Sequence, residues 1–297
     1  MPPHSHDPIA IAGTGRVAQA LGRLLAERGE PVVAVAGRNP EHTRAAVAFV
    51  GFKAKPVTLS SLPKRASRVI IAVSDSAIPE VARLLAAGGM KRGLALHTCG
   101  AVGAEGIAPL ASAGVSCGAL HPLQTFASPE QGLSALLGCT FAIDGDGPAV
   151  EWSAHIADLL GGATLSVPRE GRLLYHVAAV MASNYVVSLV DAAAMLMDAA
   201  GIKPGEALRA LGPLVEASVS NALRLGTVQA LSGPIQRGDL ETISSHLRAL
   251  AGAPESVRVL YRAAGLHTAG LAVRGGLPQD RARLIENLLK EGESAHA

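Results

Sequence analysis

Apolar runs of four to six residues recur through the first half of the chain, and helix-like segments separate them. Runs of this length between helices are typical of the buried strands of a doubly wound, largely parallel sheet. The sequence therefore predicts an α/β fold in which the loops after the strands meet at one edge, where ligands bind. The predicted strands span residues 9–12, 32–36, 53–57, 68–73, 94–97, 115–120, 139–143 and 163–167.

Strand patterns stop after Pro168, and the rest of the chain has only helical periodicity. Prolines near the starts and glycines near the ends set the expected limits of these helices. We predict a sheet-containing domain over residues 1–168 and an all-α domain over residues 169–297. The predicted helices span residues 171–200, 205–225 with a break at Gly212 and Pro213, 239–250, 254–273 and 278–290.

The helix predicted at 171–200 is apolar nearly all round, which indicates that it is buried. Polar residues interrupt it, so we expect a buried protein helix rather than a membrane span. At about 100° per residue, one arc of this helix holds His176, Ser183, Asn184 and Asp191. Buried polar groups need partners, which are either protein groups or a polar ligand between the domains. We favour the ligand for His176, Ser183 and Asn184, and a structural role for Asp191.

The first apolar run leads into a glycine turn and then into a helical segment. This order is the one required of a dinucleotide-binding βαβ unit. Gly13 allows the tight turn, Gly15 leaves the backbone open to a pyrophosphate, and Ala18 lets the helix pack closely on the strand. We therefore expect an N-terminal Rossmann domain whose cofactor contacts the turn and the helix start, at Gly13, Thr14, Gly15, Arg16 and Val17.

The end of the second predicted strand indicates which dinucleotide binds. NAD-preferring sites usually have an acidic residue there for the ribose hydroxyls, whereas this chain has Gly37-Arg38-Asn39. A guanidinium suits a 2′-phosphate, so Arg38 favours NADP as the cofactor. The alternative is that Arg38 only opens a loop and points to water.

Further candidates follow the next strands at the same edge of the sheet. Ser74 and Asp75 follow the fourth strand, and Thr98 and Gly100 follow the fifth. These residues either contact the cofactor or cap the next helices. His121 follows the sixth strand directly and can donate a proton or a hydrogen bond near neutral pH. The alternative for His121 is that it braces its loop.

A glycine-rich loop in the helical half contains Arg237 and Asp239. We expect Asp239 to cap the helix that follows. The planar fork of Arg237 suits a substrate carboxylate, and a surface salt bridge is the alternative.

Composition limits the classes of function. The 297 residues are 49% hydrophobic but only 3% aromatic, so small apolar side chains can pack helices closely. A net charge of +2 without a basic block predicts neither nucleic acid nor a membrane as partner. The three cysteines lack the close pairs of a zinc site, so we expect no metal, and their odd number fits a reducing compartment. The start of the chain lacks the pattern of a signal peptide, and we expect a cytoplasmic protein.

Four motifs together resemble the Rossmann-like reductases with a helical C-terminal domain of unassigned function. They are the glycine turn, His121-Pro122-Leu123-Gln124-Thr125-Phe126, Tyr175-His176 through Asn184-Tyr185, and Gly233-Pro234 with Arg237-Gly238-Asp239. The resemblance covers nearly the whole chain. It implies the architecture of ketopantoate reductase, pyrroline-5-carboxylate reductase and the 6-phosphogluconate and 3-hydroxyacid dehydrogenases. It also implies NADP-linked reduction and a homodimer built through the helical domain.

One position departs from ketopantoate reductase and the hydroxyacid dehydrogenases, in which a lysine on the long helix is the general acid. Here that helix has no lysine before Lys203, and His176 lies in the corresponding region with Asn184 two turns later. We therefore expect His176 or His121 as the proton donor and Asn184 as a hydrogen-bond partner of the carbonyl. Ser183 and Arg237 are the expected substrate contacts.

These residues predict an NADPH-dependent reductase that acts on the carbonyl of a small 2-oxo acid, and the resemblance implies ketopantoate, in pantothenate synthesis, as one such substrate. A cyclic-imine reductase of the pyrroline-5-carboxylate type is the alternative with the same fold. A regulatory protein that binds NADPH without turnover is the alternative from another class, and it would need no proton donor beside the nicotinamide.

Overall fold

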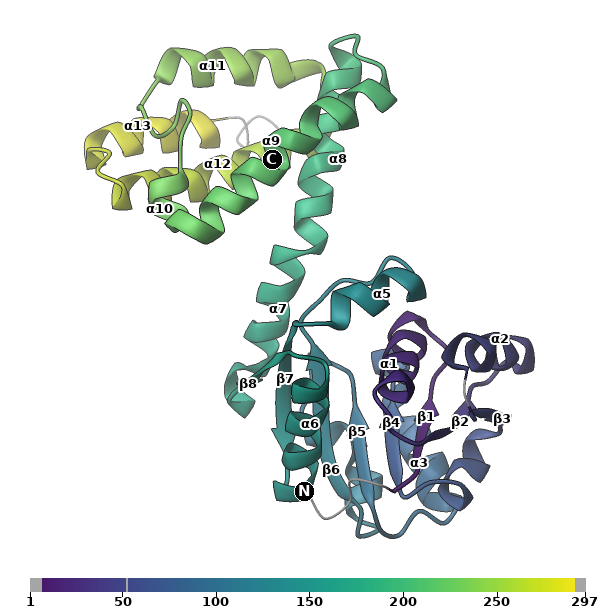
Figure 1. Ribbon diagram of the computed structural model, residues 1–297. Coiled ribbons are helices and arrows are strands. Elements are labelled where there is room, and N and C mark those ends of the chain that lie inside the picture. The colour runs from purple at the N-terminus through teal and green to yellow at the C-terminus, as the bar shows by residue number, and fades with distance from the viewer. Residues whose placement is uncertain (1–6, 52, 292–297) are drawn as a thin grey trace. The chain divides into compact units, whose positions relative to one another are not determined.

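The computed structural model describes residues 7–51 and 53–291, which belong to two compact units, Met1–Ser183 and Asn184–Ala297 (Figure 1). The expected absence of a signal peptide rests largely on residues 1–6, which lie outside the described residues.

The first unit contains an eight-stranded sheet with the strand order β3-β2-β1-β4-β5-β6-β7-β8. Its neighbouring strands are parallel except β6 and β7, which pair antiparallel. This confirms the predicted doubly wound sheet. The strand order reverses between β1 and β4, the point at which such sheets bind ligands. The strands are β1 Ile9–Ala12, β2 Val32–Ala36, β3 Lys55–Val57, β4 Arg68–Ile71, β5 Leu94–His97, β6 Ser116–Pro122, β7 Thr140–Gly145 and β8 Ala163–Ser166.

Helices cover both faces of this sheet (Figure 1). In β1, Ile9 and Ile11 join the apolar cluster of one face, with residues of α1, α2 and α6, whereas Ala10 and Ala12 join the cluster of the other face, with residues of α3 and α4. A strand covered on both faces has a continuous apolar sequence. The helices of the first unit are α1 Arg16–Glu27, α2 Pro40–Val50, α3 Ile78–Ala87, α4 Ala108–Ala111, α5 Pro129–Leu136, α6 Gly147–Leu159 and α7 Arg172–Ala182.

The helix predicted at 171–200 is two helices, because the chain leaves helical geometry at Ser183, where φ is −121° and ψ is −74°. The Ser183 hydroxyl donates to the carbonyl oxygen of Ala179 at 2.7 Å, a bond that often bends helices. By its contacts α7 belongs to the first unit, so the structure divides the chain after Ser183 rather than at residue 168. The polar stripe predicted on one straight helix is thus split between α7 and α8, which spans Asn184–Ala199.

The second unit is helical in the residues that the structure describes. Its core lies among α11, α12 and α13 and includes Ile243, Ala269 and Ile285. The predicted break at Gly212 and Pro213 is wrong. Pro213 lies inside the continuous helix α9, against which α8 and α10 pack. The helices are α8 Asn184–Ala199, α9 Pro204–Leu225, α10 Thr227–Ala230, α11 Leu240–Ala249, α12 Glu255–Arg274 and α13 Gln279–Lys290.

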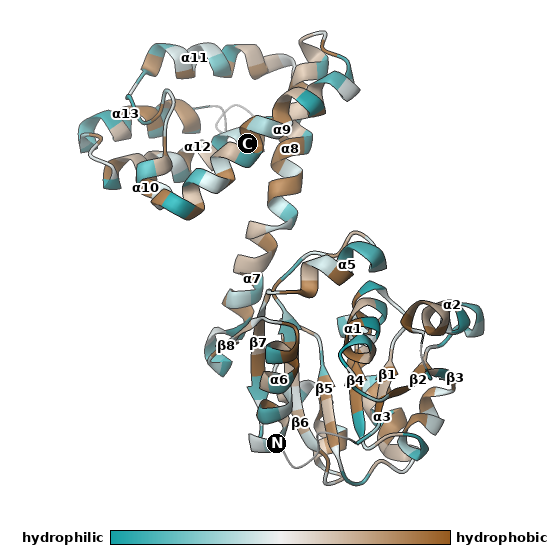
Figure 2. Ribbon diagram, viewed as in Figure 1, coloured by the Kyte–Doolittle hydropathy of each residue, from teal (hydrophilic) through white to brown (hydrophobic). Residues whose placement is uncertain are grey.

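The predicted burial of the long apolar helix is wrong for the single chain. No residue of α8 is buried, and the side chain of Val187 is 69% exposed. Figure 2 shows the apolar character of α8. By length and composition alone, the stretch Arg169–Ala199 is apolar enough to cross a membrane, with a mean hydropathy of 1.6 and none of that window buried. The sequence pattern shows that the helix is apolar, but it does not show what covers it.

A buried charge network stabilises the amino-terminal edge of the sheet. Arg68, the first residue of β4, donates from Nη2 to Glu30 Oε2 at 2.7 Å, and Glu30 Oε1 is 2.9 Å from His155 Nε2. The Arg68 guanidinium also lies 5.5 Å from the centre of the Trp152 ring. The Arg68 and Glu30 side chains are 1% and 6% exposed. Removing one partner of an ion pair buried this deeply strongly destabilises a fold.

We predict that Arg68→Met lowers the free energy of unfolding of the first unit by about 3–5 kcal/mol, because Glu30 would stay buried without its cation. Urea denaturation measures this loss. The control is Arg23→Met, which breaks a half-exposed ion pair with Glu27 on α1 and should change the free energy by at most about 1 kcal/mol. Equally small losses in the two variants would contradict the prediction.

Candidate functional site

The turn after β1 has the geometry of a phosphate-binding loop. Gly13 has a φ of +140°, and a Cβ atom there would lie 2.0 Å from the carbonyl oxygen of Ala72, so only glycine fits. A Cβ atom on Gly15, the residue before α1, would meet nothing within 4 Å. Among the described residues no side chain caps the start of α1. Its unpaired amides therefore begin beside open space, as an anionic phosphate requires.

The end of β2 packs directly on this turn. A Cβ atom on Gly37 would lie 2.5 Å from the Thr14 methyl carbon. Asn39 then caps α2, its side-chain oxygen accepting from the amides of Glu41 and His42 at 2.8 and 3.1 Å. Arg38, between these two residues, is exposed, and its side chain makes no ion pair or hydrogen bond to the described residues. The guanidinium is thus available to a phosphate group.

The loops after β4 and β5 lie at the same edge of the sheet. Ser74 and Asp75 are exposed, and the Ser74 side chain makes no capping hydrogen bond to the described part of the short 3-10 helix that follows. Thr98 is half-buried. Gly100 has a specific steric role, because a Cβ atom there would lie 2.8 Å from the imidazole ring of His121.

His121, at the end of β6, is the centre of a polar cluster within the first unit. Its Nδ1 is 2.7 Å from the hydroxyl oxygen of Tyr175 on α7. The ring of His176 lies 6.4 Å away, centre to centre, and its Nδ1 is buried without a hydrogen-bond partner among the described residues. The structure therefore brings together the two predicted histidines and adds Tyr175. Tyr175 belongs to one of the sequence motifs, but no role was predicted for it.

Burial, together with the nearby His176, Arg172 and His97, lowers the pKa of His121 to about 4 against the opposing charge of Asp75. The imidazole is therefore neutral at pH 7. Burial also raises the pKa of the Tyr175 phenol, despite the opposing effect of Arg172. At neutral pH the proton available to a reaction is thus on the Tyr175 oxygen rather than on a His121 imidazolium.

A second buried histidine at this edge, His97, was not predicted as a site residue. Its Nε2 is 2.6 Å from the carbonyl oxygen of Gly103, and its Nδ1 accepts from the amide of Cys99 at 3.3 Å. Because Nδ1 accepts, Nε2 holds the proton and donates to Gly103. The pKa of His97 is lowered, mainly by burial, and this keeps the ring neutral. His97 therefore holds the loop after β5 in place.

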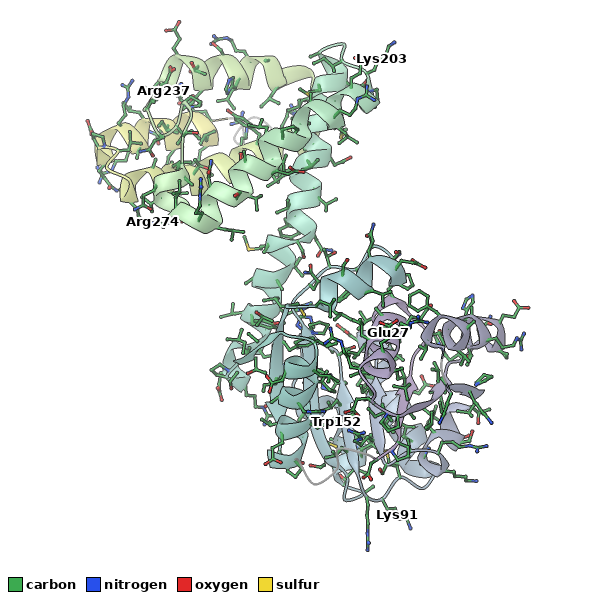
Figure 3. The ribbon with its side chains drawn as sticks, viewed as in Figure 1. Glu27, Lys91, Trp152, Lys203, Arg237 and Arg274 are labelled. Atoms are coloured by element: carbon green, nitrogen blue, oxygen red, sulfur yellow. The ribbon has the colours of Figure 1, made fainter. Side chains whose placement is uncertain are left out.

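Asn184 and Arg237 belong to the second unit, and the polar cluster belongs to the first. Asn184 begins α8, and Arg237 is exposed on the loop before α11 (Figure 3). Asp239 caps α11, as predicted, by accepting from the amide of Thr242 at 3.0 Å. Ser183, at the end of α7, donates its hydroxyl hydrogen within that helix. The substrate contacts of Ser183, Asn184 and Arg237 stay predictions.

Two protein families match separate parts of the chain. Residues 8–94 match the family described as NADP oxidoreductase coenzyme F420-dependent. Residues 139–268 match a domain of unknown function, DUF2520. Over residues 8–94 the chain is thus similar to NADP-dependent oxidoreductases. It joins an NADP-binding Rossmann domain to a helical domain of unassigned function, as the motifs implied. The first match ends before His121 and Tyr175, so it bears on the nucleotide and not on the second substrate.

Solved structures share this fold over most of the chain. Protein BF3122 from Bacteroides fragilis is 24% identical, with 86% of this chain and 95% of that chain covered and a TM-score of 0.69. Protein TM1727 from Thermotoga maritima is 20% identical, with 96% and 99% covered and a TM-score of 0.65. An imine reductase from Myxococcus stipitatus in complex with NADP+ is 15% identical, with 97% and 95% covered and a TM-score of 0.54. No curated protein matches the chain.

The residues of the turn fit NADP. The open space at Gly15 and the start of α1 would receive the pyrophosphate, and the unpaired Arg38 would receive the 2′-phosphate. Bound NADPH supplies a hydride from its nicotinamide. Near the end of β6 the protein holds a proton-bearing pair, Tyr175 and His121.

We predict that Arg38→Ala removes most of the preference for NADPH over NADH, because Arg38 is the cation beside the expected 2′-phosphate. Calorimetric titration with each nucleotide measures the two affinities. Arg83→Ala, an exposed arginine on α3, is the matched control and should keep the wild-type preference. If the wild-type protein binds NADH as tightly as NADPH, the role given to Arg38 is wrong.

Proposed function

We propose that the protein uses NADPH to reduce the carbonyl group of a small 2-oxo acid, with ketopantoate as a specific candidate. The observation that carries this proposal is the 2.7 Å contact between the Tyr175 hydroxyl and His121 Nδ1 at the ligand-binding edge of the sheet. Hydride addition to a carbonyl carbon leaves an alkoxide, which needs a proton. A phenol beside a neutral imidazole supplies that proton at neutral pH.

In the proposed mechanism His121 is the partner of the acid rather than the acid itself. With its proton on Nδ1, His121 donates to the Tyr175 oxygen, which leaves the phenol hydrogen free for the substrate. The same N–H group then stabilises the phenolate that forms. His176, with its unused Nδ1 beside this pair, offers the substrate a further hydrogen-bonding group.

Reduction of a cyclic imine is the second candidate, supported by the fold shared with the Myxococcus stipitatus imine reductase. The two reactions place different demands on Tyr175. An imine that binds as the protonated iminium accepts hydride without a proton from the enzyme, whereas a carbonyl needs the phenol proton to complete the reduction. Tyr175 therefore matters far more in carbonyl reduction, and a variant of this residue distinguishes the two candidates.

We predict that Tyr175→Phe lowers kcat for 2-oxo acids by roughly 100-fold or more, while NADPH binding is unchanged. The assay follows NADPH absorbance with a panel of 2-oxo acids, ketopantoate and cyclic imines. Tyr261→Phe is a matched control, because Tyr261 also pairs with a histidine, His246 at 2.9 Å, but in the second unit. This control should keep wild-type activity.

The outcomes separate the candidate functions. Turnover of imines that survives Tyr175→Phe would support the imine reductase. NADPH binding without turnover of any compound in the panel would contradict both reductases and support a regulatory protein that binds NADPH.

We also propose that the protein is a cytoplasmic homodimer that associates through the helices of the second unit. Large apolar side chains on α8 and α9 are exposed in the single chain: Tyr185, Val187, Leu189, Leu214, Val219 and Leu223. Apolar surface of this extent ordinarily marks an interface. A second copy of the chain presents the same apolar surface, as a two-fold interface requires. The three cysteines are buried and unpaired, which supports a reducing compartment.

We predict that the wild-type protein sediments as a dimer and that Val187→Glu shifts it to the monomer, because a charge would be buried in the interface. Leu84→Glu, at an exposed leucine of α3, is the control and should leave the dimer intact. A wild-type monomer that floats with lipid vesicles would instead assign the apolar stretch Arg169–Ala199 to a membrane.

A further inference from the structure

Arg172, the first residue of α7, is a buried cation whose donors are unused. Its side chain is 3% exposed, and Nε, Nη1 and Nη2 have no hydrogen-bond acceptor among the described residues. Its ion-pair partner is Asp144 on β7, at 3.5 Å from Nη2, too long for a good hydrogen bond. That same Asp144 oxygen already accepts from the amide of Ala104 at 3.0 Å. Buried guanidinium groups ordinarily have their donors satisfied, so Arg172 is an exception that needs an explanation.

The position of Arg172 supplies that explanation. Arg172 and Tyr175 are three residues apart on α7 and therefore lie on the same face of the helix. The loop after β5 packs against the guanidinium, because a Cβ atom on Gly103 would lie 3.3 Å from Arg172 Nε. Tyr175 in turn contacts His121. The unused positive charge thus lies on the same side of α7 as the proposed proton donor.

The charge of Arg172 acts on the neutral groups of the cluster. It lowers the pKa of His97, His121 and Tyr175, and for Tyr175 it opposes the effect of burial. Other ionisable groups face the cluster from the neighbouring elements: Asp75 after β4, Cys99 and Glu105 after β5, Asp144 on β7 and His176 on α7. Arg169, just before α7, is exposed and acts on Glu105. Arg172 is the buried permanent cation among them.

We propose that Arg172 is a positioning residue for the proton transfer: its guanidinium stabilises the negative charge that stays on the Tyr175 oxygen when the phenol proton moves to the product. The Tyr175 O–H bond breaks, the O–H bond of the product alcohol forms, and the phenolate then takes a proton from water. The proposal rests on the proposed function, because it needs Tyr175 as the donor. A cation already in place needs no reorganisation when this charge develops.

The test follows the ultraviolet absorbance of the Tyr175 phenolate as pH rises, which needs no turnover. The chain has three tyrosines, so the measurement uses full-length protein in which Tyr185 and Tyr261 are replaced by Phe. In this background Arg172→Gln should move the titration of Tyr175 to higher pH. Arg172→Lys should restore most of the original titration. Arg169→Gln, an exposed arginine just before α7, is the control and should leave it unchanged.

The second measurement is the steady-state kinetics of the same variants. Arg172→Gln should lower kcat for the reduced substrate on the order of 10-fold, with KM and NADPH binding unchanged. Should Arg172→Gln unfold, the double variant Arg172→Gln with Asp144→Asn removes both charges and should still titrate at higher pH. An unchanged Tyr175 titration in a folded variant would overturn the proposal. A shifted titration in a protein without any reductase activity would support the coupling of Arg172 to Tyr175 and contradict the proposed function.

Discussion

The contact between Gly13 and Ala72 is the constraint on which the geometry of the first unit depends. A Cβ atom on Gly13 would lie 2.0 Å from the Ala72 carbonyl oxygen. On one side the amide of Gly13 donates to Ala36 at 2.8 Å, and on the other the amide of Ala72 donates to Ala12 at 2.8 Å. The turn is thus tied to both neighbouring strands, and α1 has to start at the carboxyl edge of the sheet. A side chain on Gly13 would separate β1 from β4 and displace the phosphate site with them.

The same edge positions the chemistry through the unequal lengths of two strands. His97, the last residue of β5, pairs with Ala119, whereas β6 continues to Pro122. His121 therefore extends past the end of β5 and packs over Gly100. The chain then returns to this cluster with α7, which supplies Tyr175 and Arg172. Strand register thus places the histidine, and one helix face places both the phenol and the cation.

Local patterns in the sequence were sufficient for the strands, the glycine turn and the helix cap at Asp239, because each depends on a few adjacent residues. The position of His121 at the end of a strand was also predictable, because it follows the apolar run at 115–120. The break at Ser183 was not predictable, because it coincides with a hydroxyl–carbonyl bond inside an apolar helix. The role of Tyr175 was not predictable either, because a tyrosine in an apolar helix resembles a core residue. Its partner, His121, lies 54 residues earlier in the chain. Arg172, at the start of a helix, resembles a surface residue, and its burial depends on tertiary contacts with Gly103 and Asp144.

The second unit contains another histidine–tyrosine pair, His246 and Tyr261, in different electrostatic surroundings. His246 and Tyr261 lie 2.9 Å apart, and both line an apolar cavity of about 390 Å³ formed with α8 and α12. Burial alone raises the pKa of Tyr261, whereas for Tyr175 the charge of Arg172 opposes burial. The hydrogen bond is the same in kind in the two pairs, but the electrostatic surroundings differ. A fixed positive charge stabilises a phenolate, and in the proposed mechanism Arg172 provides that charge at Tyr175.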